Sequence, residues 1–336
     1  MIGFLQRLRR AAPLPSAPSA SPPVDSTLAT EADVLACFRL LMGRPPNPEE
    51  LRGHLAQAGH DLRGVVAGYV NSLEFARRGL LLPPEPDATV ADLDGFRIYA
   101  SAADPSVGRH VLAGVHEPEV QAAFRRVLRP GMGVIDIGAN VGFFTMLSAS
   151  IVGSTGYVLA IEPNPANVRL LEASRRLNGF ANVVPAQVAA GQRVGLLVLN
   201  STHSNGTASE LGAELGALMQ AQTVPCMPVD ALVQAGRRID LIKVDIEGAE
   251  HLALQGAEAV LARDRPCIIS EFGPSMMLGF GTDGPTYLRW LHARGYTLTV
   301  LLPDGGLLDA GQDVAPVMDA YGRCGGDHID VLAAPL

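Results

Sequence analysis

The stretch "VIDIGANVGFFT", residues 134–145, joins a short apolar segment to a glycine-containing turn and the start of a second apolar segment. Asp136 lies among apolar residues in its first part, and Gly138 and Gly142 bound the turn. Glycine allows the backbone to turn tightly and to come close to a ligand. The stretch therefore predicts a buried strand, a ligand-binding turn and a helix that ends at Gly153.

The turn differs from the one that binds dinucleotides. That turn follows the pattern G-x-G-x-x-G and holds a pyrophosphate. Counted from Gly138, the second and third glycine positions are occupied by Asn140 and Phe143. The carboxylate of Asp136 would repel a phosphate and attract an ammonium or sulfonium group. The pattern therefore argues against NAD or FAD.

A second acid, Glu162, ends the next predicted strand in "LAIEP". An acid at this place typically accepts hydrogen bonds from ribose hydroxyls. A ligand with a ribose, a positive charge and no phosphate suits both Asp136 and Glu162, and S-adenosylmethionine has these properties. The competing interpretation is that the two carboxylates only cap helices.

The rest of the chain from about residue 90 alternates between segments typical of strands and of helices. Strands alternating with helices of about 10 to 15 residues indicate an α/β, doubly wound, mostly parallel sheet. Ligands of such sheets bind beyond the carboxyl ends of the strands, where the strand order reverses. The segments predicted as strands include "VVPAQVAA" (183–190), "IDLIKVDIEG" (239–248), "PCIISEF" (266–272) and "HIDVLAA" (328–334), and "AEHLALQGAEAVLAR" (249–263) is predicted as one helix.

The N-terminal part has a different composition. Residues 1–29 form a Pro-, Ala- and Ser-rich tail that we expect to be disordered, and residues 81–94 a linker to the domain at 95–336. Between them, residues 30–80 predict an all-helical module, with Thr30 and Asp33 as a capping box and Asn47 as a second cap. The stretches "CFRLLMGRPPNPEEL" (37–51) and "NSLEFARR" (71–78) resemble short helical domains of unknown function that accompany bacterial glycan-modifying enzymes.

Composition excludes several partners and sites. The net charge is −8 and Lys243 is the only lysine, so we expect no nucleic-acid partner. The four cysteines show neither metal-site nor Cys-x-x-Cys spacing, which indicates reduced thiols in the cytoplasm. We expect no bound metal and no stable membrane insertion, because no apolar run reaches about 18 residues. Residues 1–10 could touch a membrane surface weakly, although a loose tail is the simpler interpretation.

The sequence resembles the FkbM-type family of class I S-adenosylmethionine-dependent methyltransferases. The matching stretches are "VIDIGANVGFFT", "AIEPNPANVRLL", "LIKVDIEGAEHLALQGA" and "CIISEF", in that order. The resemblance implies a Rossmann-like, seven-stranded sheet and O-methylation of sugars or polyketide-derived products. His116 stands where an aromatic residue is expected. The implied cofactor-binding residues are Asp136, Gly138, Asn140, Gly142, Phe143, Glu162, Pro163, Asn164, Val188, Ala189 and Asp245.

The segment "KVDIEGAEH" and the acid of "ISEF" supply candidates for chemistry. A hydroxyl is a weak nucleophile, so a base near the transferred methyl group helps the reaction. We expect Asp245 and Glu271 at that place, Lys243 beside Asp245, and His251 as a further candidate.

Each of these candidates has a competing interpretation. Lys243 could serve only as a buried ion pair, and His251 as a solvated residue of a helix face. Glu247 and Glu250 could be dipole partners at a helix start. Glu117 could fold over the cofactor or be a plain surface residue.

These observations predict a cytoplasmic bacterial O-methyltransferase that uses S-adenosylmethionine and modifies a sugar or glycan hydroxyl. A polyketide or other natural product is the second candidate acceptor. A non-catalytic scaffold in a glycan-assembly complex is the candidate from another class. The sequence does not determine the oligomeric state.

Overall fold

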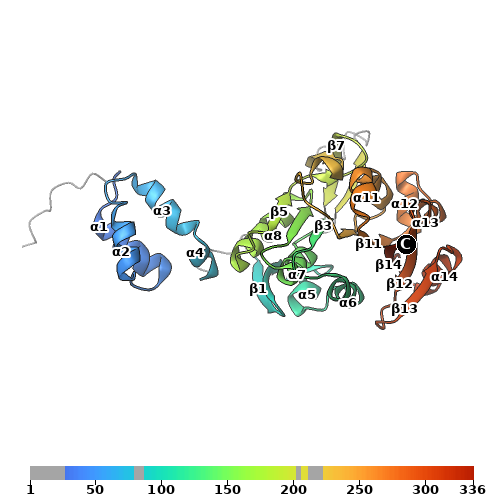
Figure 1. The fold of residues 1–336 in the computed structure, drawn as a ribbon, viewed down its shortest axis with the longest axis horizontal. Helices are drawn as coiled ribbons and strands as arrows, with labels where there is room; N and C mark the ends of the chain where they lie inside the picture. The colour runs from blue at the N-terminus through green and yellow to red at the C-terminus, as the bar shows by residue number, and fades with distance from the viewer. Residues whose placement is uncertain (1–26, 79–86, 202–205, 211–221) are drawn as a thin grey trace, which may run out of the picture. The chain divides into compact units, whose positions relative to one another are not determined.

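The computed structural model describes residues 27–78, 87–201, 206–210 and 222–336. The chain forms two compact units, with the boundary between Ser72 and Leu73 (Figure 1). Residues 1–26, which hold most of the predicted tail and the expected membrane contact, lie outside the described part. No helix in the described ranges is long and apolar enough to cross a membrane.

The described part of the first unit is helical, and the unit ends at Ser72, whereas the predicted module ran to residue 80. Its caps are confirmed: Thr30 and Asp33 form a capping box, and Asn47 caps the helix that begins at Pro48. Phe38 packs edge-on against the rings of His54 and Tyr69, and the Tyr69 hydroxyl lies 2.7 Å from His54 Nδ1. The elements are α1 (Glu31–Cys37), the π-helical turn η1 (Phe38–Met42), α2 (Pro48–Leu55) and α3 (Leu62–Val70).

The second unit is built on one large sheet, part of which Figure 1 shows as β11, β14, β12 and β13 in succession. In spatial order, the strands are β13 (Leu307–Gly311), β12 (Tyr296–Leu301), β14 (Ile329–Pro335), β11 (Cys267–Phe272), β10 (Leu241–Val244), β3 (Gly133–Ile137), β4 (Tyr157–Ile161) and β5 (Val183–Ala186). Strand order reverses between β3 and β10, so a ligand site is expected beyond the carboxyl ends of these two strands.

The mostly parallel, doubly wound character of the sheet agrees with the sequence, but the strand number does not. β5, β4, β3, β10 and β11 pair in parallel, and β14 joins them antiparallel. The described sheet has eight strands instead of seven, because β13 forms an antiparallel pair with β12 at the edge. The extra strand is a local hairpin and leaves the site untouched.

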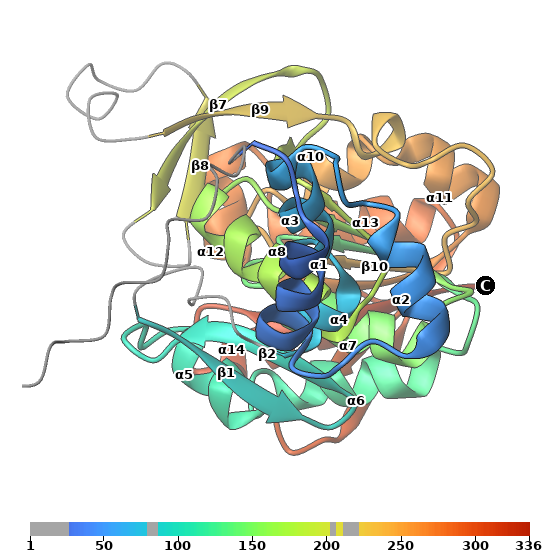
Figure 2. The ribbon, with the colours of Figure 1, turned by 90° about the vertical axis from the view of Figure 1, so that its left-hand side faces the viewer.

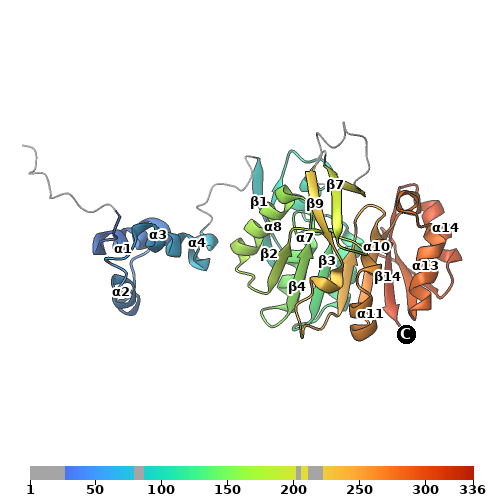
Figure 3. The same cartoon turned by 90° about the horizontal axis from the view of Figure 1, so that it is seen from above.

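Helices cover both faces of this sheet. Apolar side chains of one face pack with α5 (Gly108–Ala113), α6 (Pro118–Val127), α7 (Phe143–Val152) and α8 (Pro165–Asn178). Those of the other face pack with α10 (Glu250–Gln255), α11 (Glu258–Asp264), α12 (Pro274–Met277), α13 (Gly284–Ala293) and α14 (Ala315–Cys324), together with the short turn η2 (Val229–Ala231). Figure 3 shows α13 and α14 beside β14. Because side chains alternate along a strand, each polar residue on a strand is assigned to one of these faces.

Smaller elements complete the unit. A second sheet contains β6 (Ala189–Ala190), β9 (Gln222–Met227), β7 (Gly195–Ser201) and β8 (Gly206–Glu210), and Figure 2 shows its three longer strands together. A hairpin joins β1 (Ala88–Leu93) and β2 (Phe96–Ser101), and the short helices α4 (Leu73–Arg77) and η3 (Leu278–Phe280) lie in this unit too. Helix α4 contacts α8.

Two predicted segments differ from the structure. Part of the linker expected at 81–94 is strand β1, which pairs with β2. The predicted strand at 183–190 divides into β5 and β6, which belong to different sheets.

The helix predicted at 249–263 is also divided, into α10 and α11, and Gly256 lies at the break. A Cβ at residue 256 would lie 2.1 Å from the carbonyl oxygen of Gly191 and 3.1 Å from Cα of Pro228. The backbone passes too close for any side chain, so the break is set by packing against another part of the chain.

We therefore expect Gly256→Ala to destabilise the second unit by roughly 1–3 kcal/mol, the usual cost of overpacking. The matched control is Gly322→Ala in α14, where nothing lies within 4 Å of the added Cβ. Alanine there should be neutral or stabilising by about 0.5–1 kcal/mol. Urea unfolding of both variants measures the difference, and equal stabilities would contradict the packing argument.

Candidate functional site

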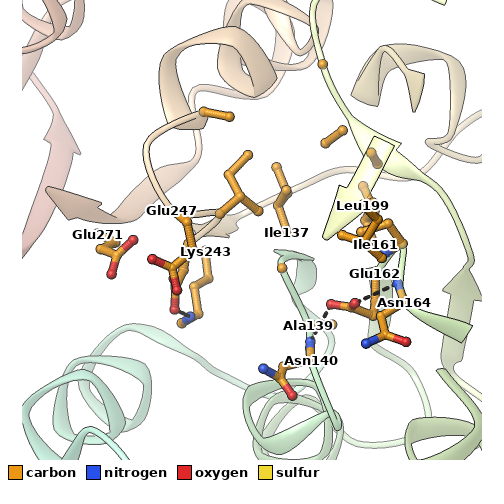
Figure 4. A pocket seen from close by; sticks show the side chains of 18 of the residues that line it. Ile137, Ala139, Asn140, Ile161, Glu162, Asn164, Leu199, Lys243, Glu247 and Glu271 are labelled. Atoms are coloured by element: carbon orange, nitrogen blue, oxygen red, sulfur yellow. Dashed lines mark hydrogen bonds and ion pairs between the residues drawn. The ribbon is translucent and has the colours of Figure 1, made fainter. Parts of the chain in front are cut away.

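A cavity of about 760 Å³ lies in the second unit, at the reversal point between β3 and β10. Residues from the ends of β3, β4, β10 and β11 line it, together with the second sheet and the segment before α6. In Figure 4, Glu162 and Asn164 lie on one side and Lys243, Glu247 and Glu271 on the other, with Ile137 and Asn140 between them. The cavity therefore has two polar ends.

The turn after β3 depends on Gly138. This residue has φ +81°, and an added Cβ would lie 1.9 Å from the carbonyl oxygen of Asp245. Only glycine lets the first turn and the end of β10 approach this closely. Asn140 follows with φ 50° and, like Gly138, lines the cavity.

Gly142 was expected in the cofactor site, but it is not among the cavity-lining residues. It begins α7 with φ +96°, and an added Cβ would lie 2.8 Å from Cγ of Leu171. Its role is to let α7 pack against α8, which places Phe143 at the cavity wall.

Glu162 anchors one end of the cavity. Its Oε2 accepts a hydrogen bond from the backbone N–H of Asn140 at 2.9 Å, and its Oε1 from that of Asn164 at 2.8 Å (Figure 4). Burial raises the pKa of Glu162 to about 7, although these hydrogen bonds oppose the shift. The carboxyl is therefore fixed across the turn, and its remaining lone pairs can accept ligand hydroxyls.

Asp136 takes a different place from the one expected. It is 1% exposed and is not a lining residue, so it lies beneath the cavity and does not form its wall. Its Oδ2 accepts a hydrogen bond from Thr145 Oγ1 at 2.6 Å, and it pairs in register with Lys243 on the face covered by α7. Burial raises the pKa of Asp136.

Lys243 forms a buried ion pair with Asp245, which the sequence analysis gave as one of its possible roles. Its Nζ lies 2.6 Å from Asp245 Oδ2, 4.0 Å from Glu117 Oε2 and 4.8 Å from the centre of the Phe144 ring. Burial opposes the charged amine, but Asp245, Glu117 and Asp136 outweigh it and raise the pKa of Lys243. Burial likewise opposes the charged Asp245, but Lys243 lowers its pKa. Both partners are therefore ionised at neutral pH.

Carboxyl groups gather at this end of the cavity. Glu271 and Asp330 are directly opposite each other on β11 and β14, and both line the cavity. Burial, then Asp245, raises the pKa of Glu271 well above its usual value. Burial, then Glu117, raises the pKa of Asp330 to about 8. The cluster therefore holds exchangeable protons at neutral pH.

The segment before α6 closes the same end. Glu117 has φ 46°, an uncommon conformation for a residue other than glycine, and lies at the cavity wall instead of on the outer surface. Burial raises its pKa to about 7. His116, which stands where an aromatic residue was expected, packs edge-on against Phe143 with ring centres 5.4 Å apart. Burial, followed by Lys243, lowers the pKa of His116 to about 4, so the imidazole is neutral.

The structure brings most predicted site residues together. Those that line the cavity are Gly138, Asn140, Phe143, Glu162, Pro163, Asn164, Ala189, Lys243, Asp245 and Glu271. Asp136, Gly142, Val188 and His251 do not line it.

His251 and Glu250 contact other parts of the fold and do not line the cavity. His251 is 6% exposed, neither solvated nor at the cavity; it contacts Thr282 Oγ1 at 3.1 Å and packs against the ring of Trp290. Glu250 accepts hydrogen bonds from the backbone N–H groups of Ile246 and Gly248 at 3.0 Å each. The helix-start role weighed for Glu250 therefore fits its contacts.

Sequence reasoning missed the contribution of β14. Asp327, His328 and Asp330 line the cavity, although the sequence analysis assigned no site role to the segment "GDHID" (326–330). Their position depends on the insertion of the last strand beside β11, which no local pattern shows. Among the described residues, no group of three His, Cys, Asp or Glu side chains has the geometry of a metal site.

Comparison with known proteins gives both a sequence and a structural likeness. Residues 136–298 match the family model described as the methyltransferase FkbM domain. No curated protein matches the chain.

Solved structures share low sequence identity with this chain. A methyltransferase FkbM from Methylobacillus flagellatus KT is 14% identical with a TM-score of 0.40, and the match covers 90% of this chain and 60% of that one. M. jannaschii TYW2 in complex with AdoMet is 15% identical with a TM-score of 0.40, covering 74% and 84%. Aeropyrum pernix fibrillarin with S-adenosyl-L-methionine is 14% identical with a TM-score of 0.39, covering 73% and 98%.

The doubly wound sheet with a cavity at its reversal point, together with the family-model match, supports the class of Rossmann-like methyltransferases. More particularly, residues 136–298 match the methyltransferase FkbM domain. The family resemblance seen in the sequence is thereby confirmed. The chain spans 60% of the length of the Methylobacillus flagellatus structure.

The raised carboxyl pKa values predict a pH dependence of stability. A carboxyl with a raised pKa stabilises the folded state at low pH, and this contribution is lost as pH rises through the folded-state pKa. For Asp330 the window runs from its ordinary pKa of 3.8 to a folded-state pKa of about 8. At pH 6, unfolding of Asp330→Asn should therefore release about one proton fewer than unfolding of the natural protein.

Calorimetric unfolding in buffers of different ionisation enthalpy counts these protons. Asp319→Asn is the control, because Asp319 lies exposed on α14 of the same unit. A proton count for Asp330→Asn equal to that of the control would show that Asp330 is already ionised in the folded protein.

Proposed function

We propose that the second unit is an S-adenosylmethionine-dependent O-methyltransferase that acts on a sugar or glycan hydroxyl. The observation that carries this proposal is the two-ended cavity. Glu162 is fixed at one end by backbone hydrogen bonds, and the pair of Lys243 and Asp245 lies with Glu271 at the other.

The residues present suit this cofactor. Glu162 offers carboxylate lone pairs to the ribose hydroxyls, and Pro163, Asn164 and Ala189 offer surface to the adenine. Gly138 and Asp245 both line the cavity where the methionine part would lie, and the carboxylate of Asp245 attracts the positive charges of the ammonium and sulfonium. When bound, the cofactor supplies an electrophilic methyl group.

The other end of the cavity has groups suited to an acceptor hydroxyl. Glu271 and Asp330 line this end, and carboxyl groups there can hydrogen-bond an acceptor hydroxyl. Lys243 holds Asp245 in place through the 2.6 Å ion pair. Positioning of the acceptor oxygen opposite the leaving sulfur supplies much of the catalysis in such a displacement.

A glycan is favoured over other acceptors by the chemistry of this end. Its carboxyl groups accept hydrogen bonds from hydroxyls, of which a sugar offers several. The acidic net charge of the protein disfavours nucleic acid. We place the reaction in the cytoplasm of a bacterium, with a glycan or small glycosylated molecule as the partner.

The polyketide alternative has one observation in its favour. Val194, Leu196, Leu197 and Leu199, on and beside β7, line part of the cavity, and Leu196 is 56% exposed. This apolar wall would suit an acceptor with an apolar part. The scaffold alternative predicts that the chain fails to bind the cofactor.

We expect Glu162→Gln to weaken S-adenosylmethionine binding about 10- to 100-fold, because hydrogen bonds to a charged group are worth about 1.5–3 kcal/mol. Isothermal titration measures the affinity. Glu258→Gln is the control, since Glu258 lies on α11, where its side chain is 50% exposed. Equal affinities for the two variants would contradict the ribose role, and no heat with the natural protein would favour the scaffold.

We expect Asp245→Asn to lower the preference for S-adenosylmethionine over S-adenosylhomocysteine, because the latter lacks the sulfonium charge. Loss of one favourable charge contact predicts roughly a 10-fold change in the affinity ratio, equivalent to about 1.4 kcal/mol. Titration with both compounds gives the ratio. An affinity ratio equal to that of the natural protein would show that the sulfonium does not bind beside Asp245.

Incubation with labelled S-adenosylmethionine and a panel of glycans and polyketides tests the acceptor class. We expect a mass increase of one methyl group on a sugar hydroxyl, read by mass spectrometry of the product. Methylation confined to the polyketides would contradict the glycan proposal and support the polyketide as acceptor.

A further inference from the structure

Asp330 has a buried carboxyl group that no other described residue satisfies. It is the second residue of β14, is 9% exposed and lines the cavity. In the register of the sheet it lies between Leu301 of β12 and Glu271 of β11, and neither side chain forms a hydrogen bond with it. No hydrogen bond or ion pair joins its side chain to any other residue in the described ranges. A buried polar group in this state needs an explanation, and a ligand supplies one.

The carboxyl of Asp330 is open to the cavity. Oε2 of Glu271 is enclosed, whereas both oxygens of Asp330 keep accessible surface although they have no partner. Because side chains alternate along a strand, Asp330 lies on the same face of the sheet as Leu332, which packs with the core on the side of α6 and α7. A molecule in the cavity can therefore contact this carboxyl without a change in the fold.

The order of the strands separates Asp330 from the cofactor end of the cavity. Glu162, which we propose binds the ribose, follows β4, and Gly138 follows β3. From β3, the sheet continues through β10 and β11 to β14. Neighbouring strands lie about 4.8 Å apart, so β14 is roughly 14 Å from β3. A cofactor that extends from Glu162 to Asp245 at the end of β10 leaves Asp330 free for the acceptor.

Acids predominate around this carboxyl. The charged and titratable groups that face it are Glu117 before α6, Lys243 and Asp245 on and after β10, Glu271 on β11, and His328 before β14. The charge of Lys243 is held by Asp245 at 2.6 Å. Burial, then Glu117, raises the pKa of Asp330 to about 8, so the carboxyl keeps its proton at pH 7. A ligand cation could replace this proton and pair with the carboxylate.

We propose that Asp330 binds the ammonium group of an amino sugar, so that the acceptor of the methyl transfer is a glycan with a free, protonated amine. This proposal rests on the proposed function and narrows its substrate class. Asp330 would determine specificity by contact with the acceptor and would take no part in the transfer itself. As the ammonium binds, one proton leaves the carboxyl for solvent and the carboxylate forms charge-assisted hydrogen bonds, which are stronger than those to a neutral sugar.

Three sugars that differ at one substituent test the site in the natural protein. Glucosamine, N-acetylglucosamine and glucose are titrated into the full chain saturated with S-adenosylhomocysteine, and nuclear magnetic resonance gives each dissociation constant. We expect glucosamine to bind about 10-fold more tightly than the other two at pH 7, because a hydrogen bond to a charged group is worth more than one between neutral groups. Equal affinities for the three sugars would overturn the proposal.

The pH dependence of the same titrations tests the displaced proton. Below the pKa of about 8, release of one proton on binding predicts an affinity for glucosamine that is about 10-fold higher at pH 7 than at pH 6. The affinity for glucose should stay constant over this range. A glucosamine affinity that is independent of pH would contradict the exchange of a proton for the ammonium.

Asp330→Asn removes the carboxylate but keeps the shape of the neutral carboxyl. We expect this variant to lose both the preference for glucosamine and its pH dependence, with an unchanged affinity for S-adenosylhomocysteine. Asp319→Asn, at an exposed position on α14, is the matched control and should behave as the natural protein. Equal glucosamine binding by the two variants would overturn the site. A matching loss of S-adenosylhomocysteine affinity in Asp330→Asn would assign the carboxyl to the cofactor's ammonium and refute the acceptor role.

Methyl transfer distinguishes this proposal from the one on which it rests. With labelled S-adenosylmethionine, an oligosaccharide of glucosamine should react with a kcat/KM about 10-fold higher than its N-acetylated form, in line with the affinities. Methylation of other sugars of the panel at an equal or higher rate would refute the amino-sugar assignment alone. Absence of cofactor binding, or of a methylated product from the whole panel, would refute the proposed function and the acceptor role of Asp330 with it.

Discussion

The close approach of the β3 turn to the end of β10 is the constraint on which the site depends. The carbonyl oxygen of Asp245 lies where a Cβ of residue 138 would stand, so these two strand ends meet only with glycine at that position. This contact lies where the order of the strands reverses. The cavity opens there, and Asp245 is held at its wall beside the first turn.

The second constraint is electrostatic. One buried lysine faces Asp245, Glu117 and Asp136, and its charge keeps Asp245 ionised against the cost of burial. For Glu271 and Asp330, burial and the neighbouring acids outweigh the effect of Lys243, so both retain protons more strongly. Removing one charge from this cluster would change the protonation of the others, because buried groups are poorly screened by solvent. The acidic end of the cavity therefore acts as one coupled system.

Much of the site was accessible from the sequence because its residues lie at strand ends with recognisable local patterns. Gly138, Glu162, Lys243 and Asp245, which this reasoning selected, line the cavity. Asp136 was expected at the cavity but does not line it, because strand alternation turns its side chain toward α7. The pattern shows that a residue ends a strand, but the neighbouring helix decides whether its side chain reaches the cavity.

The alternation of strands and helices, the glycine turn, the caps of the first helices and the family resemblance could all be predicted from the sequence, because they depend on neighbours close along the chain. The eighth strand, the break at Gly256 and the place of His328 beside Glu271 became visible only in the folded chain. Each of these depends on backbone segments that are distant in sequence. These contacts arise from tertiary packing, and a local sequence pattern does not show which distant segment will pack against it.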